Sequence, residues 1–156
     1  MRAECWGRAV VFLRVIFALA TAAYAVWNSV PPVKTLLFKF GQFHPSGTEA
    51  KFIPLMNATP VWQAALWLVA NFIYLIAAYR LVTRPRGAFP VFLLAALVDV
   101  GVWGLSKMKL VYDQTFNAQE LQLDYYILGG LAVMAVIYLL FSRTRAKRVT
   151  PTLLAG

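Results

Sequence analysis

A chain of 156 residues that is 61% hydrophobic and only 13% charged differs from soluble domains, in which about a quarter of the residues are charged. In a soluble protein, the net charge of +9 would indicate nucleic-acid binding. Here, however, the basic residues flank long apolar stretches. The composition therefore excludes a soluble nucleic-acid-binding protein and favours an integral membrane protein.

Four apolar stretches are each long enough to cross a bilayer as a helix, which needs about 20 residues. These spans lie at about residues 9–29, 60–79, 88–106 and 125–141. Little chain remains outside them, so we expect a single domain over residues 1–156. The expected fold is an all-α integral membrane protein with four transmembrane helices in an antiparallel bundle.

Basic residues predict the orientation of the spans. Nine of them would share one side of the membrane if the spans alternate: Arg2, Arg8, Arg80, Arg84, Arg86, Arg143, Arg145, Lys147 and Arg148. The other side would hold five lysines and four of the six acids. We expect the protein to lie in the cell inner membrane. The positive-inside rule then places both termini in the cytoplasm. The cluster after the fourth span favours contact with anionic lipids.

The connection between the first two spans is the longest. Asn28, Ser29 and the prolines at 31 and 32 are expected to stop the first helix. Lysines and large apolar residues follow, including Phe38, Phe40, Phe43 and His44. A solvated loop needs few aromatic residues, so we expect the outer loop, residues 30–59, to lie partly on the membrane interface or to contact a partner.

Polar and small residues mark the helix faces that meet inside a bilayer. Each span carries such a stripe: Arg14, Ala18, Thr21, Ala25 and Asn28 in the first, Gln63, Trp67, Asn71, Tyr74 and Ala78 in the second, Ala95, Asp99, Trp103 and Ser106 in the third, and Tyr126, Gly130 and Met134 in the fourth. The stripes predict one bundle core, or faces that contact a larger partner. Asn71 and Asp99 should lie at similar depth in adjacent helices, which predicts a hydrogen bond between them.

Arg14 and Asp99 are the two charged residues within the spans. An aspartate near the bilayer centre costs about 2.5–3.5 kcal/mol, and such residues often bind protons or ions. The alternative is a polar clamp to Asn71, Tyr74, Tyr126 or a partner helix, which we favour because no second buried acid continues a relay. Arg14 either extends toward the cytoplasmic surface or pairs with Asp99. We therefore take Asp99, Asn71, Arg14 and Tyr74 as a candidate intramembrane polar site.

Cofactor and catalytic signals are weak. The chain has one cysteine, Cys5, and one histidine, His44, which excludes a cysteine metal cluster and a haem held by two histidines. We predict no metal site and no cofactor beyond lipid contacts, although His44 could bind a pigment or metal together with outside ligands. No nucleophile lies beside a base in a known motif, so an enzyme is the weakest interpretation.

The layout resembles that of DoxX-like membrane proteins, which have four spans with a longer first outer loop, and Arg14 in the first span agrees with this resemblance. The resemblance implies a four-helix membrane protein of unknown activity. The second span lacks the acidic and glycine-rich pattern expected of that family.

Two functions from different classes remain open. The first is an accessory or structural subunit of a larger inner-membrane complex, which would bind other membrane subunits through helix packing and through Phe38, Phe40, Phe43 and His44. The second is a self-associating transporter or channel for small solutes or ions, in which Asp99 takes the proton or cation. The substrate and the partner are not specified by these residues.

Overall fold

The computed structural model describes residues 2–143, with side chains from residue 9 onward. The part of the chain that it describes contains helices and connections but no strand. Arg145, Lys147 and Arg148 of the predicted membrane-surface cluster lie outside the described residues, and so does the side chain of Cys5.

The described chain has four long helices and five short ones. The long helices are α1 (Arg2–Asn28), α4 (Val61–Thr83), α5 (Ala88–Lys107) and α7 (Ala118–Arg143). The short ones are α2 (Val30–Lys39), α3 (Ile53–Ala58), α6 (Leu110–Thr115) and the 3-10 turns η1 (Gly47–Phe52) and η2 (Pro85–Gly87). Four segments are long and apolar enough to cross a membrane, namely Ala9–Lys39, Val61–Thr83, Pro85–Lys107 and Ala118–Arg143. The prediction of an all-helical chain with four potential spans is confirmed.

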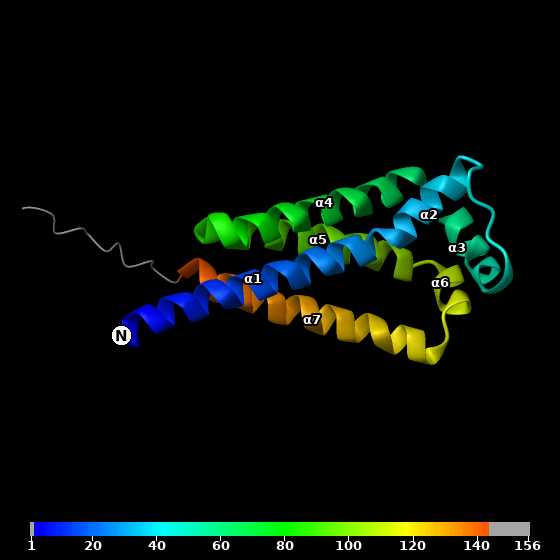
Figure 1. Cartoon of the computed structure of the whole chain (residues 1–156). Coiled ribbons are helices and arrows are strands. Elements are labelled where there is room, and N and C mark those ends of the chain that lie inside the picture. Colours follow the sequence, from blue (N-terminus) through cyan, green and yellow to red (C-terminus); the bar gives the residue numbers. More distant parts are fainter. Residues whose placement is uncertain (1, 144–156) are drawn as a thin grey trace, which may run out of the picture.

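The first candidate span differs from its predicted range because the chain stays helical after residue 29. Ser29 adopts right-handed helical angles (φ −78°, ψ −18°), and α2 carries on from α1 (Figure 1). Pro31 and Pro32 lie in the first turn of α2, where a missing backbone N–H costs least. The predicted outer loop therefore begins with a ten-residue helix, and the prolines mark a break within a longer helical segment.

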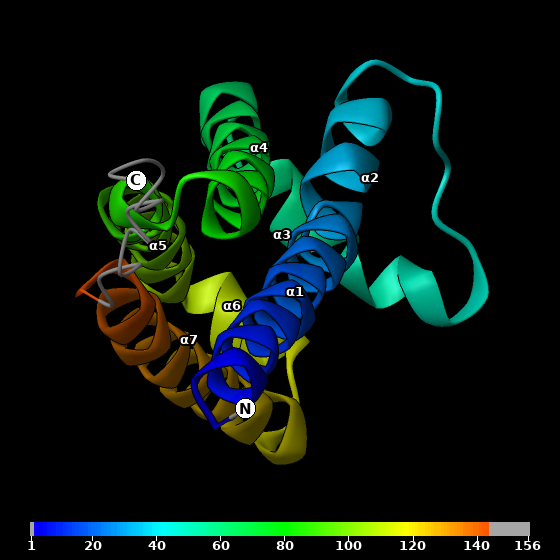
Figure 2. The same cartoon turned by 60° about the vertical axis from the view of Figure 1, so that its left-hand side comes forward.

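The α4–α5 pair forms the centre of the bundle, and α1 and α7 pack against it. α4 and α5 lie side by side, α1 lies against α4, and α7 lies against α5 (Figure 2). The start of α1, the η2 turn and the end of α7 occupy one end of the molecule, and α2, α3 and α6 occupy the other (Figure 1). We call these the η2 end and the α6 end.

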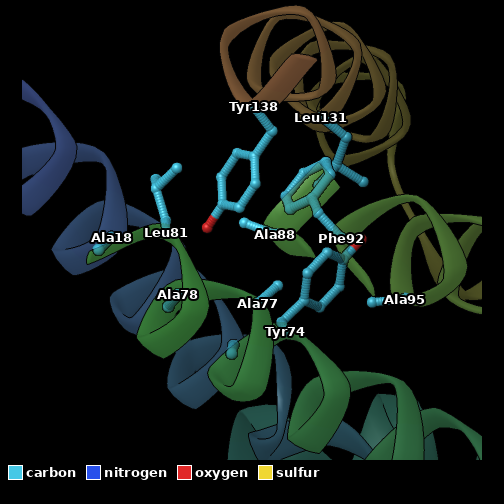
Figure 3. Packing of buried hydrophobic residues seen from close by; sticks show 11 residues of the cluster. Ala18, Tyr74, Ala77, Ala78, Leu81, Ala88, Phe92, Ala95, Leu131 and Tyr138 are labelled. Carbon is cyan, nitrogen blue, oxygen red and sulfur yellow. The ribbon is translucent and has the colours of Figure 1, made fainter. Parts of the chain in front are cut away.

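Aromatic rings form the core toward the η2 end (Figure 3). Phe92 of α5 stacks on Tyr138 of α7 with ring centroids 4.4 Å apart, and its centroid is 5.4 Å from that of Tyr74 in α4. The Tyr138 hydroxyl donates a hydrogen bond of 3.0 Å to Thr21 Oγ1. These contacts connect α7 to α5 and α1, and Phe92 connects α5 to α4.

Of the three residues predicted for the contact face of α7, Met134 is half-buried and packs against the core, but Tyr126 and Gly130 do not. Tyr126 is 74% exposed and Gly130 is also exposed, whereas Leu131 and Tyr138 are the buried residues of this helix. The reason is geometric, since residues spaced by four turn through about 400° and each step moves the row about 40° around the helix. Residues 131 and 138 differ by seven positions and therefore stay on nearly the same face.

The α6 end is covered by η1, α3 and α6, which we call the roof. Ion pairs join Lys34 to Glu49 and Lys51 to Glu120, the latter at 2.7 Å. Lys39 Nζ donates to the backbone carbonyl oxygen of Asn57 at 2.8 Å. These contacts attach η1 and α3 to α2 and α7.

The α6 part of the roof is held by Tyr112. Its hydroxyl donates to Asp124 Oδ2 at 2.7 Å, and its ring lies 4.6 Å from that of Phe116. Burial, together with the hydrogen bond to Asp124, raises the pKa of Tyr112 above its ordinary value. The hydroxyl therefore stays a donor at physiological pH.

Candidate functional site

Asp99 lies at the centre of a buried polar cluster that joins three helices. Asp99 lies near the middle of α5 and is 5% exposed. Tyr24 Oη donates to Oδ2 at 2.7 Å and Tyr74 Oη donates to the same oxygen at 3.3 Å. Asn28 Nδ2 lies 3.1 Å from Oδ1 and 3.3 Å from Oδ2. We call Tyr24, Asn28, Asn71, Tyr74 and Asp99 the Asp99 cluster.

The Asp99 cluster also replaces a backbone hydrogen bond that is lost at the break between α1 and α2. Pro31 and Pro32 have no N–H, so the carbonyls of Trp27 and Asn28 lose the donors that a continuous helix would provide. Asn71 Nδ2 donates to the Asn28 carbonyl at 3.2 Å, and Asn28 Nδ2 donates to Asn71 Oδ1 at 3.0 Å. An unsatisfied backbone group costs several kcal/mol within a bilayer, so this reciprocal pair stabilises the break.

The break lies deep within the bundle. Asn71 is the eleventh of the 23 residues of α4, and Asp99 is the twelfth of the 20 residues of α5. Because Asn28 bonds to both side chains, the end of α1 lies at the middle of these two helices. The sequence predicts Asn28 at the outer boundary of the first span, whereas the structure places it beside the middle of α4 and α5.

The Asp99 cluster contains three of the four residues predicted for the polar site, namely Asn71, Tyr74 and Asp99, but not every predicted contact among them forms. Tyr74 bonds to Asp99, but Asn71 is linked to Asp99 through Asn28, so the predicted direct hydrogen bond is wrong. Arg14 makes no ion pair with Asp99, and its guanidinium carbon lies 5.7 Å from the ring centroid of Phe141. Tyr126, the other predicted partner of Asp99, is exposed.

Tyr24 is the cluster residue that the sequence stripes missed. It is four residues before Asn28, so the two side chains share one helix face, and this spacing is the signal that was available. The ring of Tyr24 also packs edge-on against Tyr74 at a centroid distance of 5.5 Å.

The predicted outer-loop contact residues lie away from the Asp99 cluster. Phe40 and His44 are exposed, and Phe38 and Phe43 are half-buried. The ammonium of Lys34 lies 5.8 Å from the ring centroid of Phe43. These four residues therefore belong to the surface near the roof.

A cavity of about 500 Å³ extends from the Asp99 cluster to the roof. Its walls come from α1, α2, α4, α5 and α7, and most of its lining is apolar, including Val100, Ile127, Leu128 and Leu131. Tyr24, Asn28 and Asp99 line one end, and residues of η1, α3 and α6 line the other. Trp67 also lines the cavity, and its buried indole nitrogen is near the Asp99 carboxylate without a hydrogen bond of normal geometry.

The chemistry of these residues suits a small organic molecule better than a metal. Within residues 2–143, no three His, Cys, Asp or Glu side chains are grouped as metal ligands would be. The cavity volume lies within the usual range for small-molecule sites, and a few polar groups meet at one end of an apolar space.

Comparison with protein-family models, curated proteins and solved structures finds no match. The resemblance to DoxX-like proteins stays a prediction from layout.

Proposed function

We propose that this chain is a multi-pass membrane protein that binds a small, largely apolar molecule in its cavity and moves it across the membrane. The polar group of the molecule would bind at Asp99. The cavity of about 500 Å³ that ends at this buried carboxylate is the observation that carries the proposal. It develops the transporter interpretation of the sequence.

The break between α1 and α2 supports a transport role. Interrupted helices near the bilayer midplane form the substrate sites of many transporters, because irregular backbone is tolerated where it lines a cavity. Asn28 and Pro31 lie at the break and line the cavity. A role as a subunit is supported by fewer residues than the sequence predicted, since Phe40 and His44 are exposed but Phe43 lies against Lys34 within the chain.

We also propose that the four helices cross a bacterial inner membrane as an antiparallel bundle with both termini in the cytoplasm. The arginines at 80, 84 and 86 belong to the same end of the molecule as the start of α1 and the end of α7, and this distribution agrees with the positive-inside rule (Figure 1). The roof would then face the outer side.

The orientation predicts the activity of reporter fusions. Alkaline phosphatase, which is active only outside the cytoplasm, is expected to be inactive when fused after Gly156 and active when inserted after the exposed Ser46. Green fluorescent protein at the same two positions should give the opposite pattern. Phosphatase activity at Gly156 would contradict the proposed orientation.

A cavity-filling substitution tests the binding site itself. Leu128→Trp places a larger side chain in the cavity wall, whereas Leu140→Trp places it on the same helix at a residue that is 59% exposed. After mild purification from native membranes, mass spectrometry should detect a small molecule that is retained by the wild type and by Leu140→Trp. The Leu128→Trp variant should lose most of it because the space is occupied. Equal retention by both variants would contradict the site.

A further inference from the structure

Resting on the proposed function, we infer that the cavity takes an amphipathic organic cation with a single positive charge, which binds the Asp99 carboxylate while its apolar body fills the space below the roof.

The acids of this basic chain gather around the cavity. The sequence contains six acidic and 15 basic residues, yet four of those acids line the cavity: Glu49, Asp99, Glu120 and Asp124. Lys34 is the one basic residue among its described lining residues, and it pairs with Glu49. Glu120 pairs with Lys51, and Asp124 lies 3.9 Å from Lys107. Among the described lining residues, Asp99 is therefore the acid without an ion pair, and its carboxylate is the charge that a ligand in the cavity would meet.

Asp99 has hydrogen-bond donors but no cationic partner. Tyr24, Asn28 and Tyr74 all donate to it, and such donors stabilise the ionised form of a carboxylate. Among the described residues, no basic side chain lies within ion-pair distance of its oxygens. A buried carboxylate without a counter-ion is unfavourable, so binding of a cation would stabilise its ionised form.

Aromatic rings surround the same end of the cavity. Tyr24 and Trp67 line it, and the π faces of such rings attract organic cations. Trp103 lines the cavity nearer the roof, where the ammonium of Lys107 lies 5.6 Å from its ring centroid and 5.3 Å from that of Tyr112. No cation among the described residues lies over the ring of Trp67, whose indole nitrogen is near Asp99. We therefore place the positive group in the cavity beside Asp99, next to the ring of Trp67.

The lining also selects against two other kinds of ligand. An inorganic divalent cation needs several oxygen ligands, and Asp99 is the one acid in its cluster. A zwitterionic lipid that binds Asp99 through its ammonium would bury its phosphate near the same carboxylate, where like charges repel. A monocation with an apolar chain meets neither difficulty.

N-octylpyridinium is a suitable probe because the pyridinium ring quenches tryptophan fluorescence on contact. Titrated into the full chain in dodecyl maltoside, an uncharged detergent, it should quench saturably at one site per chain. Octylbenzene has the same shape without the charge, and it should compete at least tenfold more weakly. Asp99→Asn keeps the shape of the side chain and should weaken N-octylpyridinium binding by tenfold or more.

Trp67→Leu provides a second variant if Asp99→Asn does not fold. It should weaken binding of N-octylpyridinium several-fold and leave octylbenzene competition unchanged, because only the cation interacts with the ring charge distribution. Glu49→Gln lies at the roof and should change affinity less than Asp99→Asn. Size-exclusion chromatography checks that each variant is folded.

The outcomes separate the cation from the proposed function. Equal affinity for N-octylpyridinium and octylbenzene, unchanged by Asp99→Asn and lost in Leu128→Trp, would overturn the cation and leave the small-molecule site in place. Non-saturable quenching together with equal retention by Leu128→Trp and Leu140→Trp would overturn both. Displacement of the probe by phosphatidylethanolamine would overturn the assignment to a monocation.

Discussion

Phe92→Ala is expected to lower the free energy of unfolding by about 3 kcal/mol, the largest loss that we predict for a single substitution. Phe92 is 1% exposed and lies between Tyr74 and Tyr138, so its removal leaves a void and breaks both ring contacts. Because Tyr138 connects α7 to the rest of the bundle, the packing of α7 should loosen as well. Unfolding in mixed micelles with increasing sodium dodecyl sulfate, followed by circular dichroism, measures the loss.

Phe72→Ala is the matched control for this prediction. Phe72 is 64% exposed on α4, where lipid would replace its few contacts. Its substitution should change the free energy of unfolding by about 0.5 kcal/mol or less, as is usual at the surface. A loss for Phe92→Ala that does not exceed the loss for Phe72→Ala would contradict the assignment of the aromatic core.

Asn28→Ala is expected to cost about 2 kcal/mol of stability in the same assay. The Asn28 side chain donates to both Asn71 and Asp99, so its removal leaves acceptors of two buried groups with one donor fewer. Hydrogen bonds within bilayers average well under 1 kcal/mol each when the groups find other partners, and unsatisfied buried groups cost about 1–3 kcal/mol. The estimate lies in the middle of the second range and not at its upper end, because Tyr24 and Tyr74 still donate to Asp99.

A double-mutant cycle with Asn71→Ala tests the reciprocal pair. The two asparagines form a unit, so the double variant should lose clearly less stability than the sum of the single losses. Asn57→Ala is the control, because Asn57 is exposed and accepts its hydrogen bond from Lys39 through its backbone carbonyl. Fully additive losses for Asn28 and Asn71 would contradict the proposed stabilisation of the helix break.

The helical architecture follows from local sequence patterns. Apolar length predicts the four candidate spans, and the small and polar stripes predict the buried faces of the first three, including Ala25, Asn71 and Asp99. A row of residues marks one helix face only if its spacing returns to the same angle around the helix axis. The predicted row in α7 has a spacing of four and turns away from the buried face, so it does not include Tyr138.

The helix break depends on information that is distant in the sequence. A serine, a valine and two prolines in succession are compatible with the end of a helix and with the first turn of a new one. The second arrangement needs a donor for the Asn28 carbonyl, and that donor is Asn71, 43 positions further along the chain. The cavity is equally non-local, since Glu49, Asp99 and Glu120 come together only after α2, α5, α7 and the roof have packed.

The mid-length position of Asp99 has an energetic consequence for a charged ligand. In the proposed orientation, a cation that enters below the roof and reaches Asp99 has moved about halfway through the membrane voltage. A complete crossing by one charge is worth about 2.3 kcal/mol per 100 mV, so half of it gives about 1.2 kcal/mol, or roughly a sevenfold increase in occupancy. A neutral molecule of the same shape gains nothing. Occupancy of the cavity would therefore rise and fall with the energised state of the cell.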